Sequence, residues 1–230
     1  MMFEYENQMV APAEQWLRSQ GLAIKKEFPT PWGICDLVGC LLNRNKVRKR
    51  LALRQTRPIR SPLRVHLLSL IPDETDQRTV GIDELYGDFG GYLDRERIEI
   101  ELDRLLRDHF IEQPSPGAYF KRNGWMPLHK RLVAIELKLA RIDDALHQAI
   151  NNLGFADESY VGLPPDRAER LAESKRRSEF DHRGIGILAI GADRCSLVLR
   201  PQKQAPATER VTQAYSVERF WPAHLKGNEA

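Results

Sequence analysis

The stretch RLVAIELKLARIDDALHQAINNL, residues 131–153, begins as an apolar strand and continues as an amphipathic helix. The strand carries two charges, Glu136 and Lys138, near its carboxyl end. Residues i and i+2 of a strand point to the same face of the sheet. Burying both charges is costly unless they pair with other groups or hold a ligand. The strand therefore predicts either an ion pair on a solvated edge or a functional site.

The composition is typical of a folded globular protein, with 42% hydrophobic and 29% charged residues in 230. The net charge of +3 is mild, so an anion-binding surface must be local. Three cysteines form no CxxC pair, which argues against a disulfide framework or a structural zinc site. The opening MMFEYENQMV is too acidic and polar for a signal peptide, and no stretch reaches the ~18 apolar residues of a membrane span. We expect a cytoplasmic protein with no membrane contact.

A short helix and two strands are predicted before the composition changes. The helix is APAEQWLRSQGL (11–22), and the strands are AIKKEF (23–28) and GICDLVGCLL (33–42), joined by a turn. Alternation in the second strand predicts Cys35 and Leu37 on one face and Asp36 on the other. Aspartate is depleted inside strands, so Asp36 is as unusual as Glu136.

Residues 44 to 64 hold nine basic residues and no acidic one. Such a run is usually a solvated linker, and it is also the strongest candidate for contact with phosphates. The candidates for nucleic-acid contact within it are Arg48, Lys49, Arg50, Arg54 and Arg57.

Residues 62–122 predict three helices followed by a hairpin, which is the order of a winged helix-turn-helix. The third helix carries six acids and four arginines between positions 94 and 108, a surface that repels phosphates over much of its length. The residues that suit DNA are Arg95, Arg97, Lys121 and Arg122. The module is alternatively a homodimerisation or protein-docking unit, with the acidic helix as the docking face.

The predicted organisation has five parts. Residues 1–43 and 123–203 are two parts of one core, 44–61 a basic linker, 62–122 the inserted module and 204–230 a C-terminal tail. The tail is expected to be loose apart from VERFWPAHL (217–225). In the second core part, a strand at 159–164, a helix at 165–180 and strands at 184–191 and 194–201 follow the opening stretch.

Without the insert, the core is a helix, two strands, a third strand, a helix and a strand. This order resembles the PD-(D/E)XK, or restriction-endonuclease-like, nuclease superfamily, closest to its Holliday-junction-resolvase-like members of repair or defence. The residues that carry the resemblance are Glu14, Asp36, Glu136, Lys138 and Gln148. The residue before Asp36 is Cys35 and not the proline of the family pattern, but that proline is often absent. The insert explains the long separation of Asp36 from Glu136. The resemblance implies an α/β fold, a three-layer core with a mixed central sheet.

The resemblance also implies roles for these residues. Asp36, Glu136 and the carbonyl of Leu137 would hold Mg²⁺ or Mn²⁺, which prefer oxygen ligands. Lys138 would steady a metal-bound hydroxide or the charge that develops on the phosphate.

Two further residues have ordinary alternatives. Glu14 would complete the site, and Gln148 would orient a ligand or the nucleic-acid backbone. Each is otherwise an ordinary helix residue, and Asp36 is otherwise a turn or bulge residue.

The sequence thus predicts a metal-dependent DNA nuclease. The alternative is a non-catalytic DNA-binding or regulatory protein, or a protein-docking subunit, that uses the nuclease fold as a scaffold.

Overall fold

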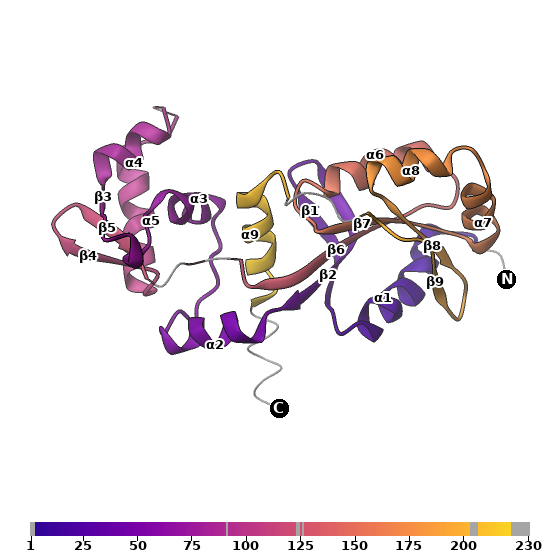
Figure 1. Cartoon of the computed structure of the whole chain (residues 1–230), viewed down its shortest axis with the longest axis horizontal. Coiled ribbons are helices and arrows are strands. Elements are labelled where there is room, and N and C mark those ends of the chain that lie inside the picture. The colour runs from indigo at the N-terminus through magenta and orange to yellow at the C-terminus, as the bar shows by residue number, and fades with distance from the viewer. Residues whose placement is uncertain (1–2, 91, 123–124, 126, 203–206, 222–230) are drawn as a thin grey trace. The chain divides into compact units, whose positions relative to one another are not determined.

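The computed structural model describes residues 3–90, 92–122, 125, 127–202 and 207–221 (Figure 1). The chain divides into two compact units. Unit 1 is Met1–Leu42 with His129–Gln213, and unit 2 is Asn43–Leu128 with Ala214–Ala230. Within the described residues, no helix combines the length and apolar character needed to cross a membrane.

Unit 1 is built on a mixed six-stranded sheet, which confirms the α/β class. Strands β6, β7 and β8 are parallel to one another, and the other neighbouring pairs are antiparallel. In spatial order the strands are β1 (Ala23–Thr30), β2 (Gly33–Leu42), β6 (His129–Leu137), β7 (Glu158–Leu163), β8 (Gly186–Ile190) and β9 (Cys195–Leu199).

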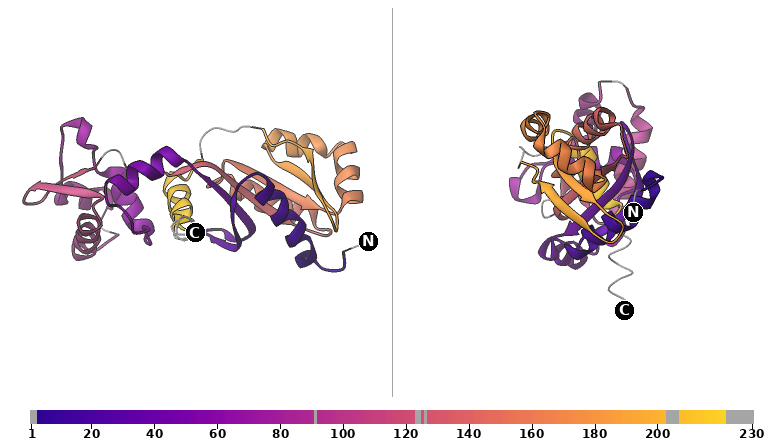
Figure 2. Two further views of the ribbon diagram at one scale, coloured as in Figure 1. Left: turned by 90° about the horizontal axis from the view of Figure 1, so that it is seen from below. Right: turned by 90° about the vertical axis from the view of Figure 1, so that its right-hand side faces the viewer.

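Helices cover both faces of this sheet (Figures 1 and 2). On one face, Leu17 of α1 packs with Leu37, Val133 and Ile135. On the other face, the helices after β6 pack on Val161, Leu163 and Ile187. The helices of unit 1 are η1 (Glu6–Met9), α1 (Val10–Ser19), α6 (Ile142–Asn152), α7 (Pro165–Glu173) and α8 (Arg177–Arg183).

The helix predicted at 165–180 is two helices. Ser174 has extended backbone angles, and its hydroxyl accepts a hydrogen bond from the N–H of Arg176. This local bond offers the backbone an alternative to the helix, and serine commonly acts in this way.

Unit 2 contains the predicted helices and hairpin. Ser61 caps the first of them by accepting a hydrogen bond from the N–H of Arg64. Its small sheet has the order β3-β5-β4. The elements are α2 (Arg44–Ala52), α3 (Pro62–Leu70), η2 (Glu74–Asp76), β3 (Val80–Gly81), α4 (Ile82–Asp88), α5 (Arg95–Arg107), β4 (Ile111–Ser115) and β5 (Ala118–Lys121).

The expected linker at 44–61 is partly helical and belongs to unit 2. Asn43 caps α2 by accepting hydrogen bonds from the N–H groups of Asn45 and Lys46. The N–H of Asn43 donates to the carbonyl of Leu128 at 2.7 Å. The two ends of the insert therefore meet, and β2 and β6 pair from Leu42 to Leu37 with a register shift between Leu41 and Leu42.

The described part of the C-terminal segment is ordered beyond the expected stretch at 217–225, because a helix begins before it. Residues 210–218 form α9 (Arg210–Glu218), and Phe220 and Trp221 are buried. Burial of two aromatic side chains explains why this segment is fixed. The parts of the expected tail at 204–206 and 222–230 lie outside the described residues.

Candidate functional site

The pairing of β2 with β6 changes at Asp36. The ladder runs from Leu42 opposite His129 to Leu37 opposite Ile135 and does not include Asp36. Instead, Oδ2 of Asp36 accepts a hydrogen bond of 2.7 Å from the N–H of Leu137. A side-chain carboxylate thus takes the place of a backbone acceptor at the end of β6, which fixes Asp36 beside Glu136.

The predicted alternation of β2 fails at the same point. Leu37 packs on the α1 face, but Sγ of Cys35 lies 3.5 Å from Nδ2 of Asn152 on α6, on the opposite face. Cys35 and Leu37 therefore do not share a face, because β2 twists between them at Asp36.

Strand β1 twists opposite the same residue. Lys26 forms an ion pair of 2.7 Å with Glu14 of α1, whereas Phe28 stacks on Phe155, which follows α6, with centroids 6.0 Å apart. Between them Glu27 has φ 45°, a left-handed conformation that costs energy in a residue with a side chain. Backbone strain in this unit is thus placed next to the unusual aspartate.

Glu136 is buried, with 2% of its surface exposed. Its Oε1 accepts a hydrogen bond of 2.7 Å from Nδ2 of Asn152. Its Oε2 is buried and has no hydrogen-bond partner among the described residues. Burial raises the pKa of Glu136 to about 7, and the charge of Asp36 contributes in the same direction. The adjacent thiol of Cys35 acts in the opposite direction and lowers the pKa of Glu136. The residue is a buried carboxylate with Oε1 bonded by Asn152 and with a thiol beside it.

Lys138 is also buried, and its Nζ lies 3.6 Å from Oε2 of Glu6. Oε1 of Glu6 in turn accepts a hydrogen bond from the N–H of Leu139. Burial raises the pKa of Asp36, while the positive charge of Lys138 lowers the pKa of both Asp36 and Glu136. Both carboxylates therefore lie within electrostatic reach of the ammonium group.

We call Asp36, Glu136 and Lys138, with Glu6 and Asn152, the strand-end cluster. Three of its five members were predicted. Asn152 lies one helical turn after the predicted Gln148 and shares its face of α6. Glu136 is bonded by Asn152 and not by the predicted Gln148. The Oε1 of Gln148 is buried without a hydrogen-bond partner among the described residues.

Glu14 lies in a different environment from the one predicted. Its carboxylate pairs with Lys26 at 2.7 Å and with Arg18 at 2.5 Å. The hydrogen bond from Lys26, followed by that from Arg18, lowers the pKa of Glu14. Two cations already satisfy this carboxylate, and the acid beside Lys138 is Glu6, which precedes the helix.

The cluster fits a metal ion that needs few protein ligands. No group of three or more histidine, cysteine, aspartate or glutamate side chains in the described part of the chain is arranged as a metal-binding set. Magnesium typically uses one or two carboxylates and keeps several waters. Asp36 and Glu136 match that smaller requirement, and the unpartnered Oε2 of Glu136 is the oxygen that fits it best.

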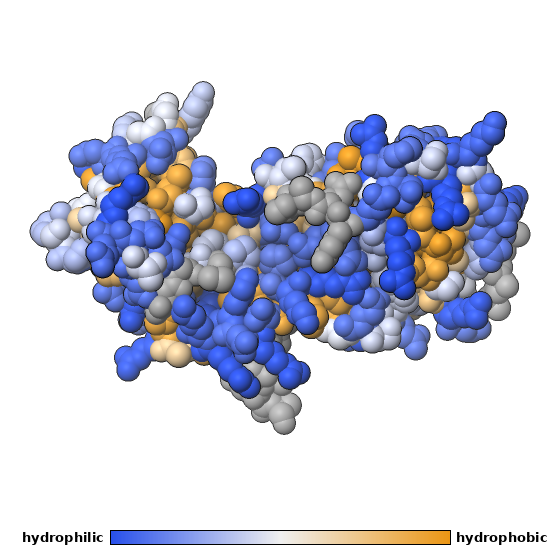
Figure 3. All heavy atoms as spheres, viewed as in Figure 1, coloured by the Kyte–Doolittle hydropathy of each residue, from blue (hydrophilic) through white to orange (hydrophobic). Residues whose placement is uncertain are grey.

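Arg50, predicted to contact nucleic acid, is instead part of the core of unit 2. Its guanidinium group is buried and pairs with Glu218 of α9 at 2.5 Å and 2.9 Å. It also lies over the ring of Trp221, 4.3 Å from the centroid. The exposed basic residues of this run include Arg48 and Lys49 on α2, where hydrophilic side chains cover the visible surface (Figure 3), together with Arg54 and Arg57.

The other basic candidates in unit 2 have mixed surroundings. Arg97 is exposed. Arg95 pairs with Asp83 and Glu99, and Arg122 pairs with Glu112 at 2.9 Å.

Lys121 donates to the carbonyl of Leu68 at 2.8 Å, and burial lowers its pKa. Three of these four residues are thus engaged within the unit.

Comparison of the chain with protein-family models, with curated proteins and with solved structures gave no match. The residues themselves provide two carboxylates and one ammonium group at the ends of neighbouring strands. Such a set can hold a hard cation and stabilise negative charge on a phosphate.

Proposed function

We propose that unit 1 is a restriction-endonuclease-like core that hydrolyses phosphodiester bonds of DNA with the help of Mg²⁺ or Mn²⁺. The observation that carries the proposal is that the N–H of Leu137 bonds Asp36 at the end of β6, next to the buried Glu136 and the buried Lys138. The supporting feature is the order of elements, with α1, β1, β2, β6, α6 and β7 following one another apart from the insert.

Each member of the strand-end cluster has a part in this proposal. Asp36 and Glu136, with the carbonyl of Leu137, would hold the metal, which when bound lowers the pKa of water and stabilises phosphate charge. Lys138 neutralises negative charge that develops on the phosphate. Asn152 fixes the orientation of Glu136.

Glu6 has a supporting part, because its carboxylate at 3.6 Å restrains Lys138. The lysine is then oriented before the reaction, which is how a preorganised charge contributes most.

For unit 2, we infer a winged helix-turn-helix that positions the core on DNA. Its support is the succession of α3, α4 and α5 followed by the hairpin of β4 and β5.

The test is cleavage of single-stranded, duplex, flap and junction DNA in Mg²⁺ and in Mn²⁺. The wild-type protein is expected to cut at least one substrate, and Asp36→Asn and Glu136→Gln to cut none. Glu169→Gln changes an exposed glutamate on α7 and serves as the control with unchanged cleavage. A wild-type protein that cuts none of these substrates would refute the proposal.

One observation favours the alternative, a non-catalytic DNA-binding or regulatory protein. Asp36 already accepts the N–H of Leu137, which gives this residue a purely structural use. Calorimetry distinguishes the two functions. Binding of Mn²⁺ that is lost in both Asp36→Asn and Glu136→Gln supports the nuclease, and no Mn²⁺ binding by the wild-type protein supports the scaffold.

A further inference from the structure

Unit 2 contains a pocket of about 410 Å³ whose lining is dominated by arginine. Its walls come from the segment before α3, from α3 itself and from the last turn of α5. We call it the arginine pocket, and its lining residues are Arg57, Pro58, Arg60, Arg64, Arg104, Arg107 and Asp108.

Carboxylates neutralise part of this charge. Asp108 lies 3.3 Å from Arg57 and 4.0 Å from Arg64. The buried Glu101 pairs with Arg64 and Arg104, each at 2.7 Å. Because Glu101 is turned inward, it is not part of an exposed docking face on α5. Two carboxylates against five guanidinium groups leave an excess of three positive charges.

Two of the arginines have no carboxylate within ion-pair distance in the described ranges. These are Arg60 and Arg107, and both are exposed. Arginines in the last turn of a helix, such as Arg104 and Arg107, are common because they offset the partial negative charge there. That explanation does not apply to Arg57 and Arg60, which lie in the segment before α3.

We propose that the arginine pocket binds phosphate groups of the DNA backbone. Guanidinium groups match phosphate oxygens with paired hydrogen bonds, and several of them around one depression suit a polyanion. The acids at the pocket end of α5, Glu101 and Asp108, are paired with arginines of the pocket. Arg60 and Arg107 have no such partner in the described ranges, so the pocket end of α5 keeps an excess of positive charge.

The lining selects the backbone over a free nucleotide. Pro58 is its one apolar residue, and no aromatic side chain contributes to it. A nucleobase would have no ring on which to stack, and stacking is the usual source of base affinity without sequence readout. The inference deepens the proposed function, because it says where the DNA is held, and it takes from that function only the choice of DNA.

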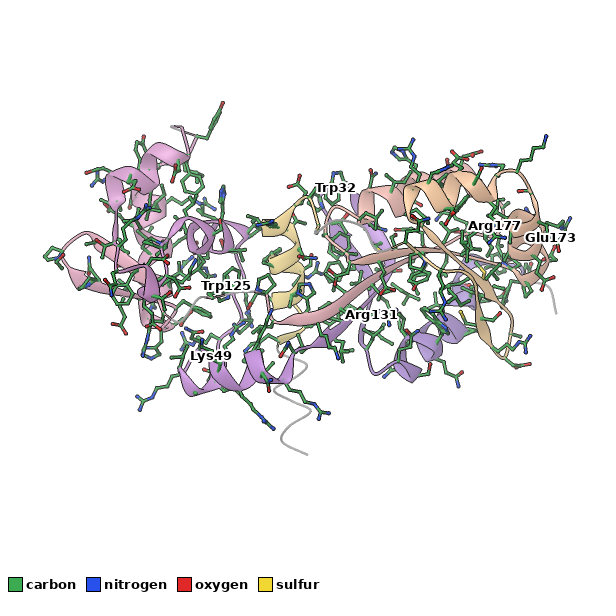
Figure 4. The ribbon with its side chains drawn as sticks, viewed as in Figure 1. Trp32, Lys49, Trp125, Arg131, Glu173 and Arg177 are labelled. Carbon is green, nitrogen blue, oxygen red and sulfur yellow. The ribbon has the colours of Figure 1, made fainter. Side chains whose placement is uncertain are left out.

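The experiment measures the affinity of a fluorescent DNA duplex by anisotropy, in EDTA and over a range of salt concentrations. The pocket variant is Arg60→Gln with Arg107→Gln. The matched control is Arg167→Gln with Arg177→Gln. Both arginines are exposed residues of unit 1, and the two substitutions remove the same amount of positive charge as the pocket variant. Arg177 is labelled in Figure 4, at the start of α8.

The pocket variant is expected to bind at least tenfold more weakly than the wild-type protein. The slope of the logarithm of the association constant against the logarithm of the salt concentration should be less steep by about 2, because each lost phosphate contact removes roughly 0.9 from it. The control should stay within twofold of wild type. A pocket variant with wild-type affinity and salt dependence would overturn the inference, as would an equal loss in the control or a wild-type protein that does not bind the duplex.

A second arm uses ATP as a probe for a small-anion site. If the pocket variant loses ATP binding but keeps DNA binding, the pocket serves a free anion and the inference is wrong. Binding in EDTA does not depend on cleavage. If the protein cuts DNA but the pocket variant binds DNA as wild type does, only the proposal for the arginine pocket is wrong. If the protein binds DNA through the pocket but never cuts it, only the proposed nuclease function is wrong.

Discussion

Asn152 donates a hydrogen bond of 2.7 Å to Oε1 of Glu136, while Oε2 of the same buried carboxylate makes no hydrogen bond of ordinary geometry in the described part of the chain. Burial favours the neutral form of Glu136, and the bond from Asn152 opposes this by favouring the ionised form. The amide thus helps to keep the carboxylate ionised near neutral pH, the form that a metal requires.

Replacing Asn152 by leucine should therefore raise the pKa of Glu136 further. The measurement is the pH at which Mn²⁺ affinity is half-maximal, followed by calorimetry, and this midpoint should move upward in Asn152→Leu. Gln148→Leu is the control, because Gln148 lies on the same helix face without bonding Glu136, and its midpoint should stay at the wild-type value. An unchanged midpoint in Asn152→Leu would mean that the bond does not control the ionisation.

The ionisation of Glu136 also predicts how stability depends on pH in the absence of metal. Its pKa is about 7 in the folded protein and 4.5 as the ordinary value. Between these values the folded state holds a proton that the unfolded state has lost, so this group's contribution to stability falls as pH rises from 4.5 to 7.

Glu136→Gln should consequently be more stable than wild type at pH 8, by roughly 1–3 kcal/mol. The difference should nearly vanish at pH 4.5, where the wild-type side chain is also neutral in the folded state. Urea unfolding in EDTA at the two pH values measures it. A variant that is less stable than wild type at pH 8 would show that the ionised carboxylate is well accommodated.

The buried pair of Arg50 and Glu218 should be important for the stability of unit 2. Both carboxylate oxygens of Glu218 bond Arg50, and one of them also accepts the N–H of Ile59. Removing one partner of a buried pair leaves an uncompensated charge, so Glu218→Ala should lose about 3–5 kcal/mol of unfolding free energy. Arg48→Ala, on the exposed side of α2, should cost less than about 0.5 kcal/mol.

Chemical denaturation followed by circular dichroism compares these variants. The double variant Arg50→Leu with Glu218→Leu should recover much of the loss, because apolar side chains of suitable size can replace a buried pair. If Glu218→Ala unfolded at the wild-type denaturant concentration, the pair would contribute nothing.

Elements defined by local patterns could be predicted from the sequence. Ser61 caps α3 as its position indicates, and the alternating and helical stretches of residues 131–153 form β6 and α6. These features depend on residues within a few positions of one another. The mixed α/β class followed from their order.

Features that depend on distant partners could not be predicted. Arg50 sits in a run that looks solvated, and its partner lies 168 residues away. Val47 and Arg50 are the buried residues of α2, and their separation of three positions places them on one side of the helix. This spacing indicates a buried side, but it does not identify Glu218 as the partner of Arg50.

The candidate site was predicted in part. Asp36, Glu136 and Lys138 stand out because charged groups are unusual in strands. Glu6 has no such signal, since it lies in a polar segment before α1. The displacement of Cys35 to the α6 face depends on the twist at Glu27 and Asp36, which strict alternation does not describe.

Lys138 gives the most direct test of the central claim, because its role separates catalysis from binding. If Asp36 and Glu136 hold the metal and Lys138 stabilises developing charge, Lys138→Met should lower the single-turnover cleavage rate on the order of 10²-fold. Loss of the positive charge should leave Mn²⁺ affinity unchanged or slightly higher. Methionine has a similar length and fills the buried space of the lysine stem.

The decisive measurement is the cleavage rate of Lys138→Met at saturating Mn²⁺, with its Mn²⁺ affinity and thermal unfolding determined on the same preparation. The nuclease site predicts a folded protein that binds metal as tightly as wild type and cuts DNA about 10²-fold more slowly. Cleavage at the wild-type rate, or a protein that no longer folds, would contradict it and make Lys138 a structural partner of Glu6.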